Sequence, residues 1–590
     1  MCGIIAVVGK TQTNKIDIDA MLASLSHRGP DDHGTLSFPL CTLGQTRLSI
    51  IDLAGGHQPM RDNSRDLAIS FNGEIYNYLE LKKKLKAKGY VFSTNSDTEV
   101  ILKAYQEYGE NCPEHLDGMF AFVIWDNTKK QLFMARDRFG KKPIYYAFDE
   151  NKNLLIASEI KALFASGKIK GVVDYRAIDN YLTLMYIPPW KTVYKNIHTI
   201  PPASSAIFKD GNLQIKRYWQ LEKRSTPVTY AEAKEEVRRL LTSAVKKRMV
   251  ADVEIGSFLS GGVDSTLVTA LAQSFSKTPI KTFSVGYQDY INELPFAEEA
   301  VKKIGTDHHT LQAKDDMIEE LKTAIEYFDE PHADSSDFPQ HLVSKLARTK
   351  VKVALSGDGA DELFLGYGWH TKHLNLSYRK HFIEKVFLDP FQGFIRNISI
   401  FTSAERKMLW KNKVEVNEDF LSDQLVHSKL TPTEKINLFD FTTYLPGQLL
   451  VKSDRMGMMN SLETRSPFLD HNLAEYVYGL PDEYKLTPKQ GSKIILKDIL
   501  GEYMPQEFVH RKKQGFGAPV KKWIEQESFK KDIYEKLCTP GAELHKIMNE
   551  SFIKKLVGMF YSNKNDSYYY KIWVLYCLEL WFQSHKQHHA

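Results

Sequence analysis

Cysteines are few in this sequence, and their spacing suggests neither a metal site nor a disulfide framework. The 590 residues include five cysteines, at positions 2, 41, 112, 538 and 577, and no Cys-x-x-Cys pair occurs. An odd and scattered set of this kind argues against a disulfide-stabilised secreted domain and for a reducing compartment. We therefore expect neither structural disulfides nor a zinc module.

Long apolar runs are also lacking. The longest apolar stretch, residues 572–582, is about half as long as a membrane-spanning helix of roughly 20 residues, and it contains Glu579. The N-terminus has no basic segment followed by an apolar core, which argues against a secretory signal. These absences predict a cytoplasmic protein without a membrane segment, and they make residues 572–582 a buried C-terminal helix.

Charge of neither sign dominates. Lys and Arg number 78 against 73 Asp and Glu, which gives a formal net charge of +5. The lysine clusters at 82–84 and 86–88 have the spacing of a solvated helix face, and no basic stripe suggests a nucleic-acid partner. With 43% hydrophobic residues, the chain is long enough for two large domains or for three to four of about 150 residues.

What the first 210 or so residues do contain is a series of short apolar strands. We predict strands at Gly3–Val8, Leu67–Phe71, Phe120–Asp126, Gln131–Arg136 and Leu154–Ser158. A turn at residues 127–130 joins two of them as a hairpin. A polar, proline-containing stretch from Pro201 to Pro227 marks a boundary, so we place the domains at residues 2–215 and 225–590.

Beyond this boundary, strands and helices alternate. We predict strands at 253–259, 280–286 and 351–355, and helices at 266–274, 294–304, 315–328 and 338–349. Such alternation is typical of a parallel sheet with helices on both faces. From about residue 370 onward the pattern is mainly helical.

Cys2 is the first candidate catalytic residue. Removal of Met1 leaves Cys2 with a thiol and a free α-amine, whose ordinary pKa values are about 8.5 and about 8. The amine can then take the thiol proton, and the thiolate can attack a carbonyl carbon. The pattern indicates an N-terminal nucleophile.

Several polar side chains suit the rest of such a site. The amide of Asn72 and the backbone N–H of Gly73, expected just past the end of the strand at 67–71, can donate to an oxyanion formed at Cys2. A free amino-acid substrate also needs a cation for its carboxylate and anions for its ammonium. Arg47 suits the first role, and Glu74 and Asp97 suit the second.

Two loops in the second half point to nucleotide chemistry. The loop Ser260-Gly261-Gly262-Val263-Asp264-Ser265 lies between a predicted strand and a predicted helix, where glycines, hydroxyls and a helix N-terminus can hold phosphate oxygens. It lacks the Gly-Lys-Ser/Thr of a Walker A loop. A second loop, residues 355–362, also follows a strand, so Asp264 and Asp361 meet at one sheet edge and could share a Mg²⁺ ion.

The first half resembles the class II glutamine amidotransferases. The resemblance rests on Cys2-Gly3-Ile4, on Arg-Leu-Ser-Ile at 47–50, on Asn-Gly-Glu-Ile-Tyr-Asn at 72–77 and on Ser-Asp-Thr-Glu at 96–99. It implies an Ntn-hydrolase-type β-sandwich covered by helices, with Cys2 as nucleophile and Asn72 and Gly73 as the oxyanion hole. The implied glutamine-binding residues are Arg47, Leu48, Ser49, Ile50, Ile51, Asn72, Gly73, Glu74 and Asp97.

The whole chain resembles the glutamine-hydrolysing asparagine synthetase family. Besides both loops, the resemblance rests on residues 452–456, 461–470 and 513–519. It implies an ATP-pyrophosphatase-like α/β domain, the substrates glutamine, aspartate and ATP, Mg²⁺ held by Asp264 and Asp361, an ammonia tunnel and a homodimer. The implied ATP-binding residues are Phe258, Ser260, Gly261, Gly262, Asp264, Ser265, Val285, Ser356 and Gly357. Asp358, Lys452 and Arg455 are the implied catalytic residues of this domain.

Two departures from the family pattern leave the acceptor open. Asp358 is one methylene shorter than the Glu of some members, and Arg455 stands where some carry a Lys, whose ammonium is a more compact charge. Three hypotheses follow: an asparagine synthetase, a paralogue that amidates another carboxylate such as a sugar uronic acid, and an inactive binding or regulatory relative. The retained Cys2 and Asp264 make the third the weakest.

Overall fold

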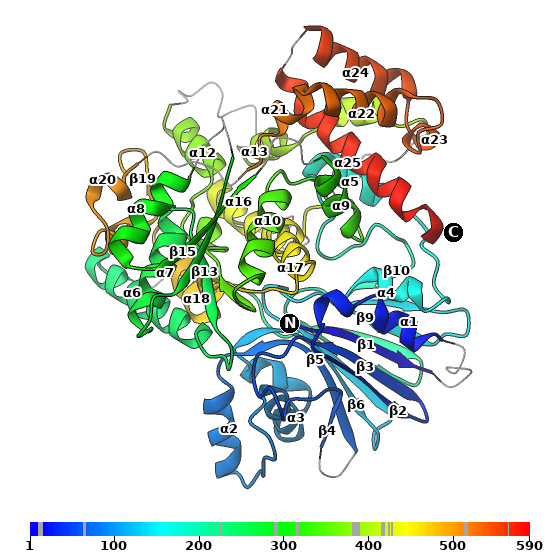
Figure 1. Cartoon of the computed structure of the whole chain (residues 1–590), viewed down its shortest axis with the longest axis vertical. Coiled ribbons are helices and arrows are strands. Elements are labelled where there is room, and N and C mark those ends of the chain that lie inside the picture. The colour runs from blue at the N-terminus through cyan, green and yellow to red at the C-terminus, as the bar shows by residue number, and fades with distance from the viewer. Residues whose placement is uncertain are drawn as a thin grey trace.

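A computed structural model describes the chain apart from residues 10–15, 63–65, 225–226, 288–292, 314–317, 380–389, 413, 415–418, 423–424, 426–428, 512–516, 564–565 and 590. Within the described part, no helix has both the length and the apolar character needed to cross a membrane. Figure 1 shows a β-sandwich formed by the N-terminal part of the chain, a parallel sheet beside it, and helices of the C-terminal part at the far end.

Two antiparallel six-stranded sheets make up the sandwich. The first has the order β10 (Ile197–Thr199), β8 (Tyr145–Phe148), β9 (Leu154–Ala157), β1 (Gly3–Val8), β3 (Cys41–Arg47), β2 (Asp32–Phe38). The second has the order β12 (Asn212–Arg217), β11 (Ser204–Lys209), β7 (Gln131–Arg136), β6 (Gly118–Asp126), β5 (Leu67–Ile75), β4 (Met60–Arg61). The predicted hairpin is confirmed as β6 and β7.

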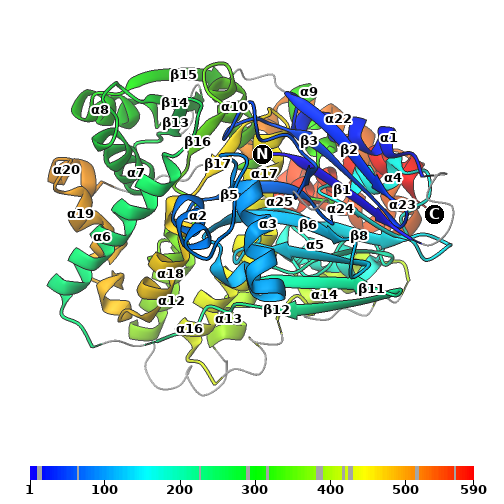
Figure 2. The ribbon, with the colours of Figure 1, turned by 90° about the horizontal axis from the view of Figure 1, so that it is seen from below.

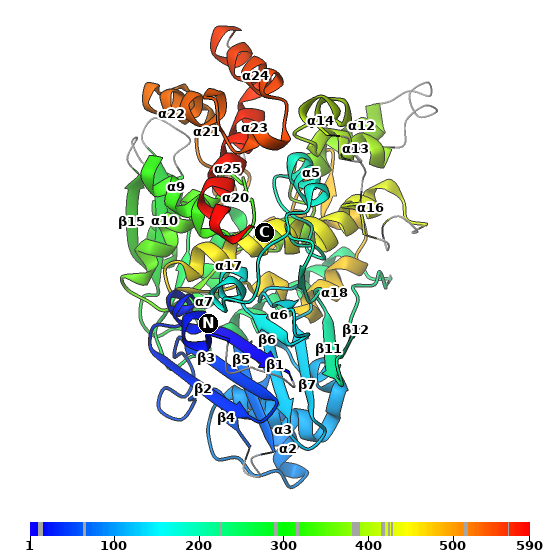
Figure 3. The same ribbon diagram turned by 90° about the vertical axis from the view of Figure 1, so that its right-hand side faces the viewer.

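Alternation along the strands sorts the side chains into layers. In β1, Ile4 and Val8 point into the core between the sheets, whereas Ile5 and Val7 pack toward α1 (Ile18–Ala23) and α4 (Ile160–Ala165). On the opposite side, α2 (Tyr78–Ala87) and α3 (Asp97–Tyr108) cover the second sheet (Figure 3). The predicted sandwich covered by helices is confirmed.

A five-stranded parallel sheet forms the core of the second half. Its order is β15 (Asp307–Ala313), β14 (Lys281–Tyr287), β13 (Ile255–Phe258), β16 (Val353–Leu355), β17 (Glu463–Arg465). Val353 and Leu355 face α6 (Tyr230–Arg248) and α7 (Val263–Ser274), while Ala354 faces α10 (Asp337–Arg348). Helices on both faces are therefore confirmed, and Figure 2 shows β17 at the edge next to the sandwich.

The C-terminal part is mainly helical, as predicted. Its longer helices include α12 (Gly368–Arg379), α13 (Pro390–Ile398), α22 (Glu527–Cys538), α24 (Glu550–Asn563) and α25 (Tyr569–His585). In addition, α16 (Pro432–Phe439), a π-helical segment (Asp440–Leu449) and α17 (Leu450–Met458) follow one another without a break.

The predicted buried C-terminal helix corresponds to α25, and its one acidic residue is hydrogen-bonded. The carboxylate of Glu579 accepts the backbone N–H groups of Glu543 and Leu544 at 3.0 and 2.9 Å, at the start of α23 (Leu544–Ile547). A helix N-terminus favours a negative charge, so this carboxylate can be buried within an otherwise apolar helix.

Candidate active sites

Cys2 lies directly before β1 and beside the end of β5. Its backbone N–H donates to Asn72 Oδ1 at 2.9 Å, and its carbonyl accepts a hydrogen bond from Arg28 Nε at 3.1 Å. The predicted strand end at Phe71 is wrong, because residues 72–75 continue to pair with residues 118–121 of β6. Gly73 has φ +150°, and a Cβ there would lie 2.0 Å from the carbonyl oxygen of Met119, so the close pairing requires glycine.

A cavity of about 30 Å³ opens next to Cys2, and we call it the Cys2 pocket. Asn72 Nδ2, close to Cys2, is buried without a hydrogen-bond partner among the described residues. Buried donors normally have partners, so this amide is free to donate to an oxyanion. Of the residues predicted to bind glutamine, Arg47, Leu48, Ile50, Ile51, Gly73, Glu74 and Asp97 line the pocket. Asn72 and Ser49 are not among the lining residues. Asn72 accepts the N–H of Cys2, and the N–H of Ser49 donates to Asp31 Oδ2 at 2.8 Å.

The charged groups of the Cys2 pocket are held by their neighbours. The guanidinium of Arg47 donates to the carbonyl oxygens of Ile51 and Asp52 at 3.1 and 2.8 Å. Asp97 accepts the N–H of Ile75 at 3.0 Å, and burial raises its pKa to about 6. The pocket therefore has a fixed cation on one side and a carboxylate whose charge depends on pH near neutrality.

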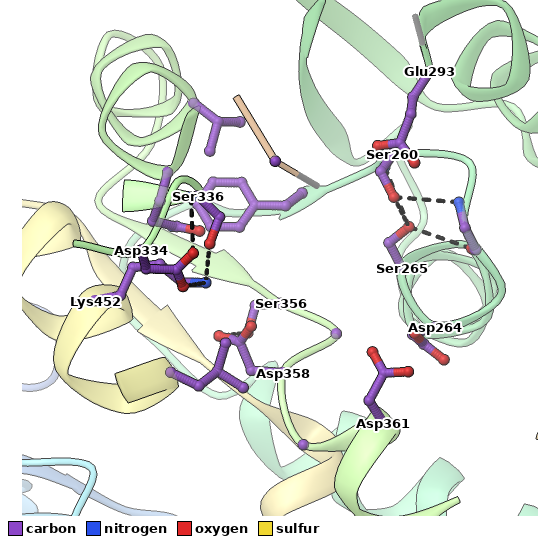
Figure 4. A pocket seen from close by; sticks show the side chains of 18 of the residues that line it. Ser260, Asp264, Ser265, Glu293, Asp334, Ser336, Ser356, Asp358, Asp361 and Lys452 are labelled. Carbon is purple, nitrogen blue, oxygen red and sulfur yellow. Dashed lines mark hydrogen bonds and ion pairs between the residues drawn. The ribbon is translucent and has the colours of Figure 1, made fainter. Parts of the chain in front are cut away.

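A larger cavity of about 460 Å³ lies at the carboxyl edge of the parallel sheet (Figure 4), and we call it the sheet-edge pocket. The loop after β13 and the loop after β16 form adjacent walls, as expected for neighbouring parallel strands. Of the residues predicted to bind ATP, Phe258, Ser260, Gly262, Asp264, Ser265, Val285, Ser356 and Gly357 line it. Gly261 belongs to the same loop without being a lining residue.

The first of these loops is stabilised by its own hydroxyls. Ser260 Oγ lies 3.1 Å from Ser265 Oγ and accepts the N–H of Gly262 at 3.2 Å. Gly261 has φ +73°, and a Cβ there would lie 2.6 Å from the carbonyl carbon of Phe296. The loop thus leads into the N-terminus of α7, which can hold an anion.

The two predicted metal ligands face one cation. The ammonium of Lys493, which precedes α19 (Ile494–Leu500), donates to Asp361 Oδ1 at 2.7 Å and pairs with Asp264 Oδ2. Burial disfavours the charged lysine, but both carboxylates outweigh it and raise its pKa. Two carboxylates that already share a cation offer the hard oxygen donors that Mg²⁺ prefers, so the donor set fits this ion.

Asp358 and Lys452 also line the sheet-edge pocket. Asp358 Oδ2 accepts hydrogen bonds from Ser356 Oγ at 2.9 Å and Ser453 Oγ at 3.0 Å. Lys452 Nζ donates to Ser336 Oγ at 2.6 Å and lies 3.3 Å from Asp334 Oδ2. Burial disfavours the charged form of Lys452, but nearby carboxylates, Asp334 above all, outweigh this effect and raise its pKa, so the side chain is a cation.

Arg455 does not enter this pocket. Its guanidinium lies 2.7 Å from Glu159 Oε1 and 3.3 Å from Asp329 Oδ2, and it lines a separate cavity of about 30 Å³. Arg455 lies three positions after Lys452 on α17, so its side chain leaves the helix about 60° away from that of Lys452. The two buried carboxylates then hold the guanidinium toward the sandwich. The structure thus brings together the predicted residues of each pocket except Ser49, Gly261 and Arg455.

Three residues at the sites have no role in the sequence-based prediction. Lys493 follows a short polar turn and belongs to no motif. Glu463 and Arg465, on the polar strand β17, lie within the family segment at 461–470, but that segment predicts no site role for them. Arg465 NH2 lies 2.9 Å from Glu74 Oε2, and Glu463 lines the Cys2 pocket although it is 461 positions away in sequence. Residues 513–516 of the motif at 513–519 lie outside the described residues.

Comparison with known proteins identifies the family. The model of the asparagine synthase family matches residues 236–583, and that of the glutamine amidotransferase domain matches residues 1–219. Asparagine synthetase [glutamine-hydrolyzing] 1 of Bacillus subtilis is 33% identical to this chain, and the match covers 98% of the chain and 96% of the relative. The chain belongs to the asparagine synthase family. The predicted family and enzyme class, a glutamine-hydrolysing carbon–nitrogen ligase that uses ATP, are confirmed.

Other relatives of the family are also similar over most of their length. Asparagine synthetase [glutamine-hydrolyzing] 3 of Bacillus subtilis is 32% identical, with 96% of this chain and 94% of the relative covered. Amidase chyE of Penicillium rubens is 27% identical, with 94% and 92% covered. The domain boundaries at 2–215 and 225–590 stay a prediction.

Proposed function

We propose that this enzyme makes asparagine from aspartate, ATP and glutamine, with Cys2 as the nucleophile of glutamine hydrolysis. The observation that carries the proposal is the contact of the Cys2 backbone nitrogen with Asn72, whose own amide donor has no partner among the described residues. A nucleophile, a donor for its oxyanion and a separate pocket with a Gly-rich anion loop in one chain are the parts that this reaction requires.

In the first half-reaction, Cys2 Sγ attacks the side-chain amide carbon of glutamine after its proton passes to the α-amine exposed by removal of Met1. The oxyanion forms between Asn72 Nδ2 and the N–H of Gly73. The α-ammonium passes its proton to the leaving nitrogen, and collapse then expels ammonia and leaves a thioester, which water hydrolyses to glutamate and the free Cys2 thiol. Arg47 holds the substrate carboxylate from one side, and Glu74 and Asp97 attract its ammonium from the other.

In the second half-reaction, the aspartate side-chain carboxylate attacks the α-phosphate of ATP to give β-aspartyl-AMP and pyrophosphate. Ser260, Gly262 and Ser265 cradle the phosphates, while Phe258 and Val285 flank the nucleotide. Asp264 and Asp361 would hold Mg²⁺, which supplies positive charge to the phosphate oxygens. The Lys452 ammonium lies on the wall of the pocket and favours the negative charge that develops on the acyl group.

Ammonia released at Cys2 then attacks the acyl carbon of β-aspartyl-AMP, forming asparagine and releasing AMP. It passes through an internal tunnel, as in the family that the chain resembles. By the same resemblance, we propose a homodimer in the cytoplasm.

The deciding experiment is aspartate-dependent pyrophosphate release with MgATP and glutamine, with asparagine measured in the same sample. Equal amounts of asparagine and pyrophosphate support the proposal. Glutamate without asparagine contradicts aspartate as the acceptor and favours another carboxylate, such as a sugar uronic acid, which a screen of acids then identifies. No glutamate and no pyrophosphate would support an inactive relative.

A further inference from the structure

One wall of the Cys2 pocket comes from the other half of the molecule. Glu463 on β17, the edge strand of the parallel sheet, is fully buried and lines this pocket. Its Oε2 lies 3.1 Å from the ammonium of Met1, and its Oε1 accepts from Arg465 Nε at 2.8 Å. All the predicted glutamine-binding residues belong to the N-terminal half, so Glu463 adds a wall that this half does not supply.

The charges around Glu463 favour a bound ammonium. Three carboxylates face the pocket, those of Glu74, Asp97 and Glu463. Arg465 pairs with both glutamates, and the Met1 ammonium contacts Glu463. Removal of Met1 takes one of these two cations away. A buried carboxylate that loses its cationic partner is destabilised, so the position next to Glu463 favours another ammonium in place of that of Met1.

Other charged groups do not fill that corner. Arg47, across the pocket, is held by the carbonyl oxygens of residues 51–53. Lys142 lies 3.7 Å from Asp454 in the adjoining interface. Arg465 is already engaged on several sides, since its NH1 donates to the carbonyls of Arg248 and Val250 at 2.9 and 2.7 Å. The position next to Glu463 Oε2 is thus suited to a small primary ammonium.

We propose that Glu463 binds a primary ammonium in the Cys2 pocket and so makes the C-terminal half supply a positioning residue for glutamine hydrolysis. This inference rests on the proposed function of Cys2. Two ammonium groups have the required chemistry: that of the glutamine substrate, and that of Cys2 itself once Met1 is removed. Either would be held in place by a carboxylate that belongs to the sheet of the synthetase reaction.

The test compares full-length wild type with Glu463→Gln and Glu463→Asp. Ammonia release is measured from glutamine and from glutaramate, which is glutamine without its α-amine. Loss of a charged hydrogen-bond partner predicts that Glu463→Gln lowers kcat/KM for glutamine about 10- to 100-fold, and that Glu463→Asp recovers part of it. Glu254→Gln, at an exposed ion pair with Lys281, is the matched control and should leave kcat/KM unchanged.

The two substrates and a pH profile distinguish the two ammonium groups. If Glu463 holds the substrate, KM for glutamine rises and glutaramate is hydrolysed equally by wild type and Glu463→Gln. If it holds Cys2, both substrates lose activity equally, and the acidic limb of the profile moves to lower pH because the amine loses a neighbouring anion. Both outcomes support the proposal.

A kcat/KM for glutamine within twofold of wild type in Glu463→Gln overturns it. Ammonia-dependent pyrophosphate release on the same sample reports whether the variant is folded. If Glu463→Gln is unfolded, Glu463→Asp tests the proposal instead, because it keeps the negative charge but has a side chain one methylene shorter. An unchanged KM and pH profile in that variant overturns the proposal. If the enzyme fails to make asparagine, ammonia release from glutamine can still be measured. The role of Glu463 and the proposed asparagine synthesis are therefore tested separately.

Discussion

Among the five cysteines, Cys2 is distinguished by its surroundings. Burial raises the thiol pKa values of Cys41, Cys112, Cys538 and Cys577, which keeps those side chains protonated. Cys2 alone lies beside a cavity with an unpartnered amide donor among the described residues. Reactivity therefore follows from the position at the start of β1 and the donor on β5.

Replacing Cys2 separates the two half-reactions. Cys2→Ala removes the nucleophile, so glutamine-dependent synthesis should fall by at least about 1,000-fold while synthesis from free ammonia continues. An N-terminal tag that blocks Cys2 should have the same effect. Cys538→Ala, at a half-buried cysteine that lines neither pocket, is the control for loss of a thiol. Full glutaminase activity in Cys2→Ala would contradict the N-terminal-nucleophile proposal.

Asp97 gives glutamine hydrolysis a second dependence on pH. Burial raises its pKa to about 6, so the side chain is an anion above that pH and neutral below it. Only the anion attracts the substrate ammonium. The plot of log(kcat/KM) for glutamine against pH should therefore steepen as pH falls below about 6, beyond the slope from the Cys2 amine. Asp97→Asn should have low activity without this steepening, and a wild-type profile that steepens only near pH 4 would refute the assignment.

At the scale of the element, regular strands and helices could be predicted and polar edge strands could not. The strand at Gly3–Val8 and the helix at Leu294–Ile304 have the predicted bounds, because apolar periodicity and terminal charges mark them. The strand β17 reads Glu-Thr-Arg and carries no such signal. It is a strand because it pairs with β16, a contact that no local pattern encodes.

At the two sites, too, residues within a local motif could be predicted, and residues brought in by contacts between distant segments could not. Residues within a motif, such as Ser260 to Ser265, could be predicted because the loop carries its own chemistry. Lys493 could not, because it reaches Asp264 across 229 positions through packing alone. Arg455 stands next to predicted residues in sequence, yet the helical turn of α17 and the carboxylates of Glu159 and Asp329 direct it out of the sheet-edge pocket.

The loop after β13 depends on the backbone conformation of Gly261. Gly261→Ala forces a side chain into φ +73° and toward Phe296, so the loop must shift. We expect KM for ATP to rise about tenfold or more, while glutamine hydrolysis is retained. Gly305→Ala is the matched control, since Gly305 has φ +81° with open space around it and ends α8 (Leu294–Ile304) outside the pocket. An equal effect of both variants on KM would mean that general strain is responsible.

At the scale of the whole molecule, a buried cluster of charges joins the two pockets. Arg28, from the sandwich, donates to Cys2 on one side and to Glu159 and Asp454 on the other, at 2.6 and 2.8 Å. Asp454 lies on α17, the helix that also carries Lys452 of the sheet-edge pocket. Arg28 therefore links the backbone of the nucleophile to α17 by a hydrogen bond and an ion pair, in addition to the contacts that β17 makes with the sandwich.

Disrupting this cluster should lower the free energy of unfolding of the enzyme. Asp454→Asn leaves Arg28 buried with less compensating charge, which costs about 3 kcal/mol, at the low end for a buried pair because the amide still accepts a hydrogen bond. Urea unfolding measures this loss. Glu236→Gln, which removes the charge of an exposed pair with Arg239, should cost at most about 1 kcal/mol.

Asp454→Asn also tests whether the cluster couples glutamine hydrolysis to asparagine synthesis. Since Arg28 holds the carbonyl of Cys2, a displaced Arg28 should let the Cys2 pocket move relative to the sheet-edge pocket, and ammonia should escape to solvent. Asp454→Asn is then expected to release more glutamate than asparagine, with both half-reactions still measurable, whereas Glu236→Gln keeps the wild-type ratio. An Asp454→Asn enzyme that is less stable but retains that ratio would make the cluster purely structural. The alignment of the two pockets would then depend on β17 and its contacts with Glu74 and the N-terminus.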